Sequence, residues 1–261
     1  MIKLDVDARG VATLTMNRPD KHNALSQALI DDLSAAAAEI AGRADIRVVV
    51  LTGAGASFCA GGDLVWMQDQ MAGADAMRRA AATSIAQMLG ALNTLPQPLI
   101  GKLNGNALGG GVGMACVCDI AIAADHAKFG LTEVKLGLIP ATIGPYVLAR
   151  MGEAKARQVF MSGRVFGADE AQQLGIIARA VSAEGLDEAV EREVAPYLQA
   201  APGAVTAAKR FARSLGPVID DDTVARSIDA LIAQWQSDEA KEGISAFFER
   251  RKPRWSVESG R

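Results

Sequence analysis

Two glycine-rich turns carry the strongest chemical signal in this sequence of 261 residues. The first is the segment 57–64 (SFCAGGDL), and the second is the segment 104–113 (NGNALGGGVG). Small residues let a ligand approach main-chain N–H groups, and a glycine run that opens a helix adds the positive end of the helix dipole. Two such turns meeting at one point would form an oxyanion hole, although a single run can also serve close packing of a helix on a strand.

Several other catalytic motifs are missing from the sequence. His22 and His126 are far apart, and no Cys/His cluster has ligand spacing, so we predict no metal site. No G-x-S-x-G elbow or Walker motif occurs, and Phe58 occupies the third glycine position of a G-x-G-x-x-G pattern that starts at Gly53. Backbone N–H groups and carboxylates are therefore the groups left to do chemistry.

The first half of the chain must position these turns through alternating strands and helices. Apolar and β-branched runs predict strands at 11–16, 47–52, 98–103 and 117–123, and the second of these is apolar enough to be covered on both faces. Ser26 can cap a helix whose buried face runs from Leu29 to Ile40.

The second half of the chain is mostly helical. Apolar residues recur at helix spacing over 224–235 and again over 244–248. We expect an α/β core over residues 1–201 and a helical C-terminal section over residues 202–261, with the change near Pro202.

Six segments, taken in order, resemble the crotonase (enoyl-CoA hydratase/isomerase) superfamily. They are 17–26 (NRPDKHNALS), 60–63 (AGGD), the glycine turn 105–113 running on to Cys118 and Asp119, 129–133 (FGLTE), 137–140 (GLIP) and 246–250 (AFFER). The resemblance implies a crotonase-like spiral of ββα repeats with a helical C-terminal trimerisation section. It also implies an acyl-CoA thioester substrate, whose carbonyl carries the charge of an enolate.

The same resemblance assigns roles to individual positions. It implies that the N–H groups of Ala60 and Gly110 form the oxyanion hole and that Glu133 is the catalytic carboxylate. A dry pocket, to which Leu131 and Val134 could contribute, would raise the pKa of Glu133, whereas Asp119 is expected to be structural. The remaining implied contacts with the CoA ester are Lys21, His22, Ala24, Gly61, Gly62, Asp63, Leu64, Leu108, Gly109, Phe247 and Arg250.

One position departs from the family pattern. Two-glutamate hydratases place an acid two residues after the GGG run, and here that position is Gly113. One carboxylate with an oxyanion hole is enough for enolate chemistry with a single base. The sequence from 131 to 147, together with Gly113, resembles bacterial methylglutaconyl-CoA hydratases. We expect the walls of the acyl pocket to include 67–71, Met77 and 142–146.

Four functions remain open. The first is hydration of a 2-enoyl-CoA, for which branched or carboxylated esters such as 3-methylglutaconyl-CoA are among the candidates. The second is isomerisation of an enoyl-CoA double bond by the same glutamate. A thioesterase or decarboxylase would use the same oxyanion hole. A non-catalytic or RNA-binding protein is the alternative of another class, and its support is the basic cluster of Arg250, Arg251, Lys252 and Arg254.

Composition narrows the partners and the compartment. The formal net charge of -3 does not suit a nucleic-acid binder, and the uncharged stretch 103–118 is about sixteen residues, below the ~20 that a spanning helix needs. Three cysteines without a C-x-x-C pair and a charged start favour a reducing, cytoplasmic location. We expect a homotrimer or dimer of trimers with no permanently bound cofactor, CoA entering as part of the substrate.

Overall fold

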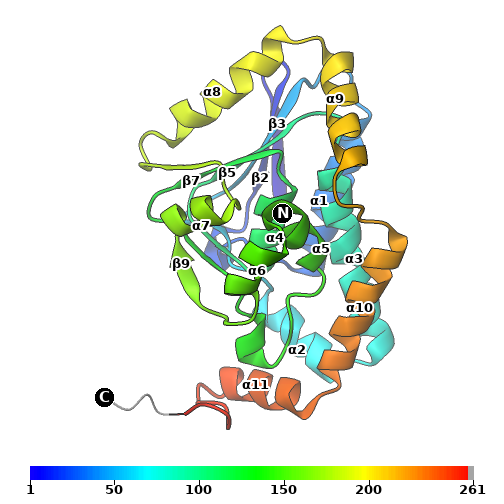
Figure 1. Cartoon of the computed structure of the whole chain (residues 1–261), viewed down its shortest axis with the longest axis vertical. Coiled ribbons are helices and arrows are strands. Elements are labelled where there is room, and N and C mark those ends of the chain that lie inside the picture. The colour runs from blue at the N-terminus through cyan, green and yellow to red at the C-terminus, as the bar shows by residue number, and fades with distance from the viewer. Residues whose placement is uncertain (258–261) are drawn as a thin grey trace.

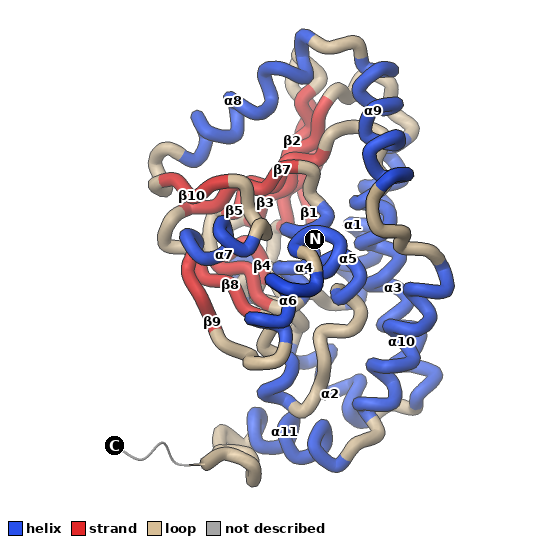
Figure 2. Tube along the Cα trace, in the orientation of Figure 1, coloured by secondary structure: helices blue, strands red, loops and turns tan. Residues whose placement is uncertain are grey.

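The computed structural model describes residues 1–257 and shows an α/β protein built on two sheets (Figures 1 and 2). Its strands are β1 Ile2–Val6, β2 Val11–Met16, β3 Val48–Gly53, β4 Ser57–Cys59, β5 Leu99–Leu103, β6 Asn106–Leu108, β7 Ile120–Ala124, β8 Lys128–Gly130, β9 Val165–Gly167 and β10 Arg179–Val181. Its α-helices are α1 Gln27–Ala41, α2 Leu64–Ala72, α3 Asp75–Asn93, α4 Gly110–Val117, α5 Gly144–Met151, α6 Glu153–Phe160, α7 Ala168–Leu174, α8 Leu186–Gln199, α9 Pro202–Leu215, α10 Asp221–Trp235 and α11 Asp238–Phe248, and two 3-10 turns are η1 Pro19–Lys21 and η2 Glu133–Leu136.

The chain winds as a spiral through the two sheets. The larger sheet has the order β1-β2-β3-β5-β7-β10 and is parallel except for the β1–β2 pair. The smaller sheet has the order β4-β6-β8-β9, with β9 antiparallel to β8. In the middle of the chain, a turn of the spiral adds one strand to the larger sheet, one to the smaller and then a helix, as in β3-β4-α2 and β5-β6-α4. This confirms the predicted ββα architecture.

Strand β3 shows why the larger sheet is buried on both faces. Val49 and Leu51 pack into the main core, whereas Val48 and Val50 face a second core closed by α8. Alternate residues of a strand point to opposite faces, so an unbroken apolar run is the pattern that such a strand requires. The predictions for β2 and β5 are also confirmed, to within one residue at the start of β5.

Helix α1 begins where its cap predicts. The Oγ of Ser26 accepts a hydrogen bond from the Leu29 N–H at 3.4 Å, and Leu29, Leu33 and Ile40 are fully buried. An N-cap hydroxyl satisfies one of the unpaired N–H groups of the first turn, which fixes the helix start.

The predicted strand at 117–123 is wrong at its beginning. Helix α4 runs to Val117, and β7 starts at Ile120. Short apolar runs do not distinguish a buried helix from a buried strand, and α4 is buried over most of its length. Cys116 therefore lies in α4, and both it and Cys118 are buried.

The C-terminal helices α9, α10 and α11 run down one side of the molecule and across its lower end (Figure 1, orange to red). Helix α10 packs against α3, and α11 packs against η2, so the C-terminal section lies directly against the α/β core. The division at residues 201 and 202 remains a prediction. Over residues 1–257, no helix is both long and apolar enough to span a bilayer.

Candidate active site

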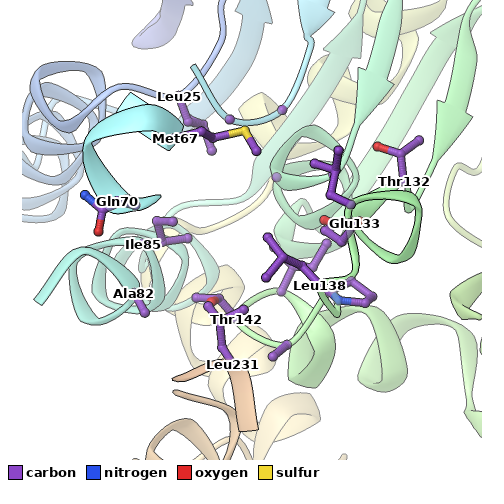
Figure 3. Close-up of a pocket in the computed structure, with 18 of the residues that line it drawn as sticks. Leu25, Met67, Gln70, Ala82, Ile85, Thr132, Glu133, Leu138, Thr142 and Leu231 are labelled. Atoms are coloured by element: carbon purple, nitrogen blue, oxygen red, sulfur yellow. The ribbon is translucent and has the colours of Figure 1, made fainter. Parts of the chain in front are cut away.

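A cavity of about 400 Å³ lies where the two glycine-rich turns meet (Figure 3). Helices α2, α3, α10 and α11 and the segment after η2 close its other sides. The predicted site residues that line it are Ala60, Gly61, Gly62, Leu64, Leu108, Gly109, Gly110, Glu133 and Phe247. Residues from both glycine turns, from η2 and from α11 are thus brought to one place.

Glu133 is the carboxylate of this cavity. Its Oε2 atom is buried and has no hydrogen-bond partner among the described residues. Its Oε1 atom lies so close to Gly109 that a Cβ at that position would be 3.0 Å away, and Gly109 has the left-handed φ of +48°. Burial raises the pKa of Glu133 to about 7, because the charged form loses its hydration.

The walls around Glu133 differ from those predicted. Leu136, Leu138 and Ile139 line the cavity, and Figure 3 shows Leu138 beside the carboxyl group. Leu131 belongs to the main core instead, and Val134 points toward Gly163. The prediction that Leu131 and Val134 contribute to the pocket is therefore wrong, because Leu131 packs into the main core just before η2 and Val134, on η2, lies against Gly163.

Gly110 supplies one main-chain donor at the cavity. It is the first residue of α4, where the N–H groups have no partner within the helix. No acceptor for the Gly110 N–H lies among the described residues. The N–H is therefore available to a ligand and benefits from the positive end of α4.

The first glycine turn corrects the assignment of Ala60 as the second donor. The Ala60 N–H already donates to the His22 carbonyl oxygen at 3.0 Å. The Leu25 N–H donates to the Gly61 carbonyl oxygen at 2.7 Å, and the Leu25 carbonyl oxygen accepts from the Asp63 N–H at 2.9 Å. The N–H of Gly62, the residue between Gly61 and Asp63, therefore points away from Leu25. Within residues 1–257 it has no acceptor. The geometry favours Gly62 over Ala60 as the donor opposite Gly110.

Asp63 holds the first turn in place and does not line the cavity. Its Oδ1 accepts from the Val65 N–H at 2.9 Å and caps α2, while Oδ2 pairs with Arg18 at 2.9 Å. Burial alone would raise the pKa of Asp63, but the bonds from Arg18 and the α2 amides lower it below its usual range. Arg18 also donates to the Ala24 carbonyl at 2.7 Å, a role that sequence analysis missed although Arg18 lies in the first family segment.

Lys21, His22, Ala24 and Arg250 also lie outside the cavity lining. Lys21 and His22 are exposed beside the first turn, and Ala24 is buried beneath it. Arg250 is exposed just after α11, whereas Phe247 on that helix does reach the cavity. The contact of these residues with CoA remains a prediction.

Ile143 occupies the space beside the unusual glycine at position 113. A Cβ at Gly113 would lie 2.6 Å from the Ile143 Cγ2 atom, and Ile143 lines the cavity. An acid at position 113 therefore has no room in this chain. Thr142 and Met67 line the cavity as predicted, but Met77 is half exposed and lies outside the lining.

Asp119 and Cys59 are structural, as their surroundings show. Asp119 accepts from the Leu99 N–H at 2.7 Å and from the Lys209 ammonium at 2.6 Å, which ties α9 to the sheet. Burial raises the pKa of the Cys59 thiol to about 12, so it stays protonated beside the glycine turn.

The basic cluster near the C-terminus is partly neutralised within the chain. Arg251 pairs with Glu242 at 2.6 Å and with Glu249 at 2.5 Å, and Arg254 pairs with Glu242 at 3.6 Å. The hydrogen bond from Arg251 holds the pKa of Glu242 at about 2. Part of this positive charge is thereby compensated, which weakens the case for an RNA-binding surface.

Comparison with known proteins agrees with the geometry. A family model described as "Enoyl-CoA hydratase/isomerase" matches residues 7–258. The chain belongs to this family. "Probable enoyl-CoA hydratase echA8" of Mycobacterium tuberculosis is 32% identical over 247 residues, which are 94% of each chain. A solved enoyl-CoA hydratase from Shewanella pealeana has a TM-score of 0.80 at 34% identity, covering 97% of this chain and 95% of its own. The solved structure of Pseudomonas aeruginosa AtuE has a TM-score of 0.78 at 34% identity, and the match covers 98% of this chain and 99% of its own.

Proposed function

We propose that this protein adds water across the C2–C3 double bond of a 2-enoyl-CoA. The observation that carries the proposal is one buried carboxylate, Glu133, in the same cavity as the N–H groups of Gly62 and Gly110, which have no acceptor among residues 1–257. The matching family and the names of the relatives support the same reaction.

The reaction follows from these groups. The thioester oxygen accepts hydrogen bonds from Gly62 and Gly110, which stabilise the negative charge that develops as C3 is attacked. Ionised Glu133 removes a proton from a water molecule while the oxygen of that water bonds to C3. The protonated Glu133 then returns that proton to C2, so the product contains one water more and the carboxylate is restored. A pKa of about 7 suits a group that must both accept and donate a proton near neutral pH.

The walls indicate an uncharged acyl chain. Ala82, Ile85, Leu138 and Leu231 form an apolar surface beyond Glu133. A carboxylated chain such as 3-methylglutaconyl would need a cation, and Arg78 is the cation of the described lining. Since Arg78 is already paired with Asp75 at 2.8 Å, an uncharged chain, linear or branched, fits this wall better than a carboxylated one.

Isomerisation of a 3-enoyl-CoA is the second candidate, and Ile143 is the observation that favours it. The side chain fills the space in which a second acid could hold water with Glu133. An isomerase needs only one base, which removes a proton at C2 and delivers it to C4. The enolate between these steps would use the same N–H groups.

We also propose that the chain assembles as a homotrimer or a dimer of trimers through its C-terminal section. On and just after α9, the apolar side chains of Phe211, Leu215 and Val218 are 66 to 73% exposed. Single exposed apolar residues are ordinary on a protein surface, but several large ones within eight residues suit contact with a second copy of the chain. Analytical ultracentrifugation should give a mass of three or six chains, and a monomer at micromolar concentration would reject this assembly.

The test of the proposed activity follows the enoyl-thioester absorbance and the product mass. Crotonyl-CoA, 3-methylglutaconyl-CoA and a 3-enoyl-CoA are incubated with wild type, Glu133→Gln and the exposed control Glu184→Gln. We expect water addition by wild type and the control, and at least ~100-fold lower kcat for Glu133→Gln. Wild-type turnover in Glu133→Gln would remove this carboxylate from the reaction.

A further inference from the structure

A second cavity lies next to the proposed acyl cavity. Its volume is about 370 Å³, and it is lined by Met71, Arg78, Trp235, Gln236, Lys241 and Ile244. Two of these, Arg78 and Trp235, also line the first cavity. The two side chains therefore stand between the cavities.

The guanidinium group of Arg78 is held firmly in this position. Its Nε donates to the Gln70 carbonyl at 2.8 Å, and its Nη2 donates to the Met71 carbonyl at 3.0 Å. Its Nη1 donates to Asp75 at 2.8 Å. These bonds fix Arg78 at the C-terminal end of α2, where a cation also complements the helix dipole.

Trp235 closes the other half of the wall. The Arg78 Cζ atom lies 5.4 Å from the Trp235 ring centre, within the range of a cation–π contact. Trp235 ends α10 one turn after Leu231, and both side chains line the first cavity. Figure 3 places Leu231 across the cavity from Leu25 and Met67, which lie beside the first glycine turn. The α10 wall is thus on the side of the cavity away from the oxyanion donors.

We propose that the Arg78–Trp235 pair is the end wall of the acyl cavity and limits the length of the acyl chain. With the wall in place, a short apolar enoyl chain fills the first cavity, and a longer chain would have to displace the paired side chains. Without the indole, the two cavities join and the chain extends toward Met71 and Ile244. This rests on the proposed function, since it assigns the cavity beyond Glu133 to an acyl chain.

The test compares chain lengths. Wild type, Trp235→Ala and Trp235→Phe are assayed with crotonyl-CoA, 2-hexenoyl-CoA and 2-decenoyl-CoA. Each further buried CH₂ group is worth roughly fourfold in affinity. We therefore expect Trp235→Ala to raise the ratio of kcat/KM for the ten-carbon ester over the four-carbon ester at least tenfold above the wild-type ratio. Trp235→Phe, which keeps an aromatic ring over Arg78, should stay within about threefold of the wild-type ratio.

Trp255→Ala is the matched control, because this tryptophan lines neither cavity and is 41% exposed. It should leave the ratio unchanged. If Trp235→Ala does not fold, Trp235→Leu is used in its place. An unchanged ratio in the folded variant would overturn the assignment of the wall.

Binding separates this inference from the proposed reaction. If wild type hydrates none of the esters, the hydratase proposal fails, but calorimetric affinities for butanoyl-CoA and decanoyl-CoA still test the wall. A decanoyl preference that increases at least tenfold in Trp235→Ala would support the wall without any turnover. Equal preference in wild type and variant would reject it.

Discussion

Replacement of Glu133 by glutamine should make the protein's stability less sensitive to alkaline pH. The folded-state pKa of Glu133 is raised from 4.5 to about 7 by burial. A carboxyl group with a raised pKa binds its proton more tightly in the folded than in the unfolded state. Its contribution to stability is therefore fully present below pH ~4.5 and is lost as the pH rises through about 7, where the folded protein must hold a buried charge.

The magnitude follows from the shift in pKa. A shift from 4.5 to about 7, at about 1.36 kcal/mol per unit, corresponds to about 3 kcal/mol of lost unfolding free energy at pH 9. Glutamine does not ionise, so Glu133→Gln should not lose this energy. For a chain of this size, about 3 kcal/mol moves the melting temperature by roughly 6–12 °C.

The assay is denaturant unfolding of wild type and Glu133→Gln at pH 5 and pH 9, with Glu184→Gln as the exposed control. The packing effect of the new amide is the same at both pH values and cancels when the two differences are subtracted. Because part of the loss has already occurred at pH 5, we expect Glu133→Gln to gain about 2–3 kcal/mol relative to wild type between pH 5 and pH 9, and Glu184→Gln to gain nothing. A gain below about 0.5 kcal/mol would show that the Glu133 carboxylate is hydrated or paired when charged, which would refute the dry site.

Three further outcomes are expected. Gly62→Pro should lower kcat by about 100-fold or more with little change in melting temperature, because it removes an N–H that has no acceptor among the described residues. Ala60→Pro should mainly destabilise the fold, because it removes the donor to the His22 carbonyl. The reverse pattern would restore Ala60 as the oxyanion donor. Gly113→Glu should abolish activity, because the new Cβ would collide with the Ile143 side chain. Adding Ile143→Gly to this variant should restore soluble, folded protein, as measured by circular dichroism. A stable Gly113→Glu single variant would contradict this packing. Lys209→Met should cost about 2–4 kcal/mol in urea unfolding, since it leaves Asp119 without its cation, and an unchanged midpoint would show that the pair contributes nothing.

Features that depend on local sequence could be predicted. The β-branched run before Gly53 predicts a strand buried on both faces, and the Ser26 cap predicts the start of α1. The two glycine turns are visible in the sequence by themselves, whereas Glu133 was found only through the joint resemblance of several segments, because a lone glutamate has no local signal for burial. The missing acid at Gly113 is visible in the sequence, but the reason that it cannot be restored lies in Ile143.

Features that depend on tertiary contacts could not be predicted. Which main-chain N–H of the first turn is free depends on pairing with Leu25, and the resemblance alone pointed to Ala60. The Arg78–Trp235 wall joins helices α3 and α10, and no motif spacing connects them. The boundary between α4 and β7 failed for another reason, since buried small residues suit either conformation.

The proposed function is tested most directly by product mass in ¹⁸O-labelled water. Purified protein is incubated with crotonyl-CoA, and the CoA ester is analysed before and after the enoyl absorbance falls. Hydration by the Glu133 site predicts a product heavier by one molecule of labelled water, formed by wild type and Glu184→Gln but not by Glu133→Gln. No labelled product from any 2-enoyl-CoA, together with a 3-enoyl-CoA that changes its double bond at constant mass, would contradict hydration and establish the isomerase.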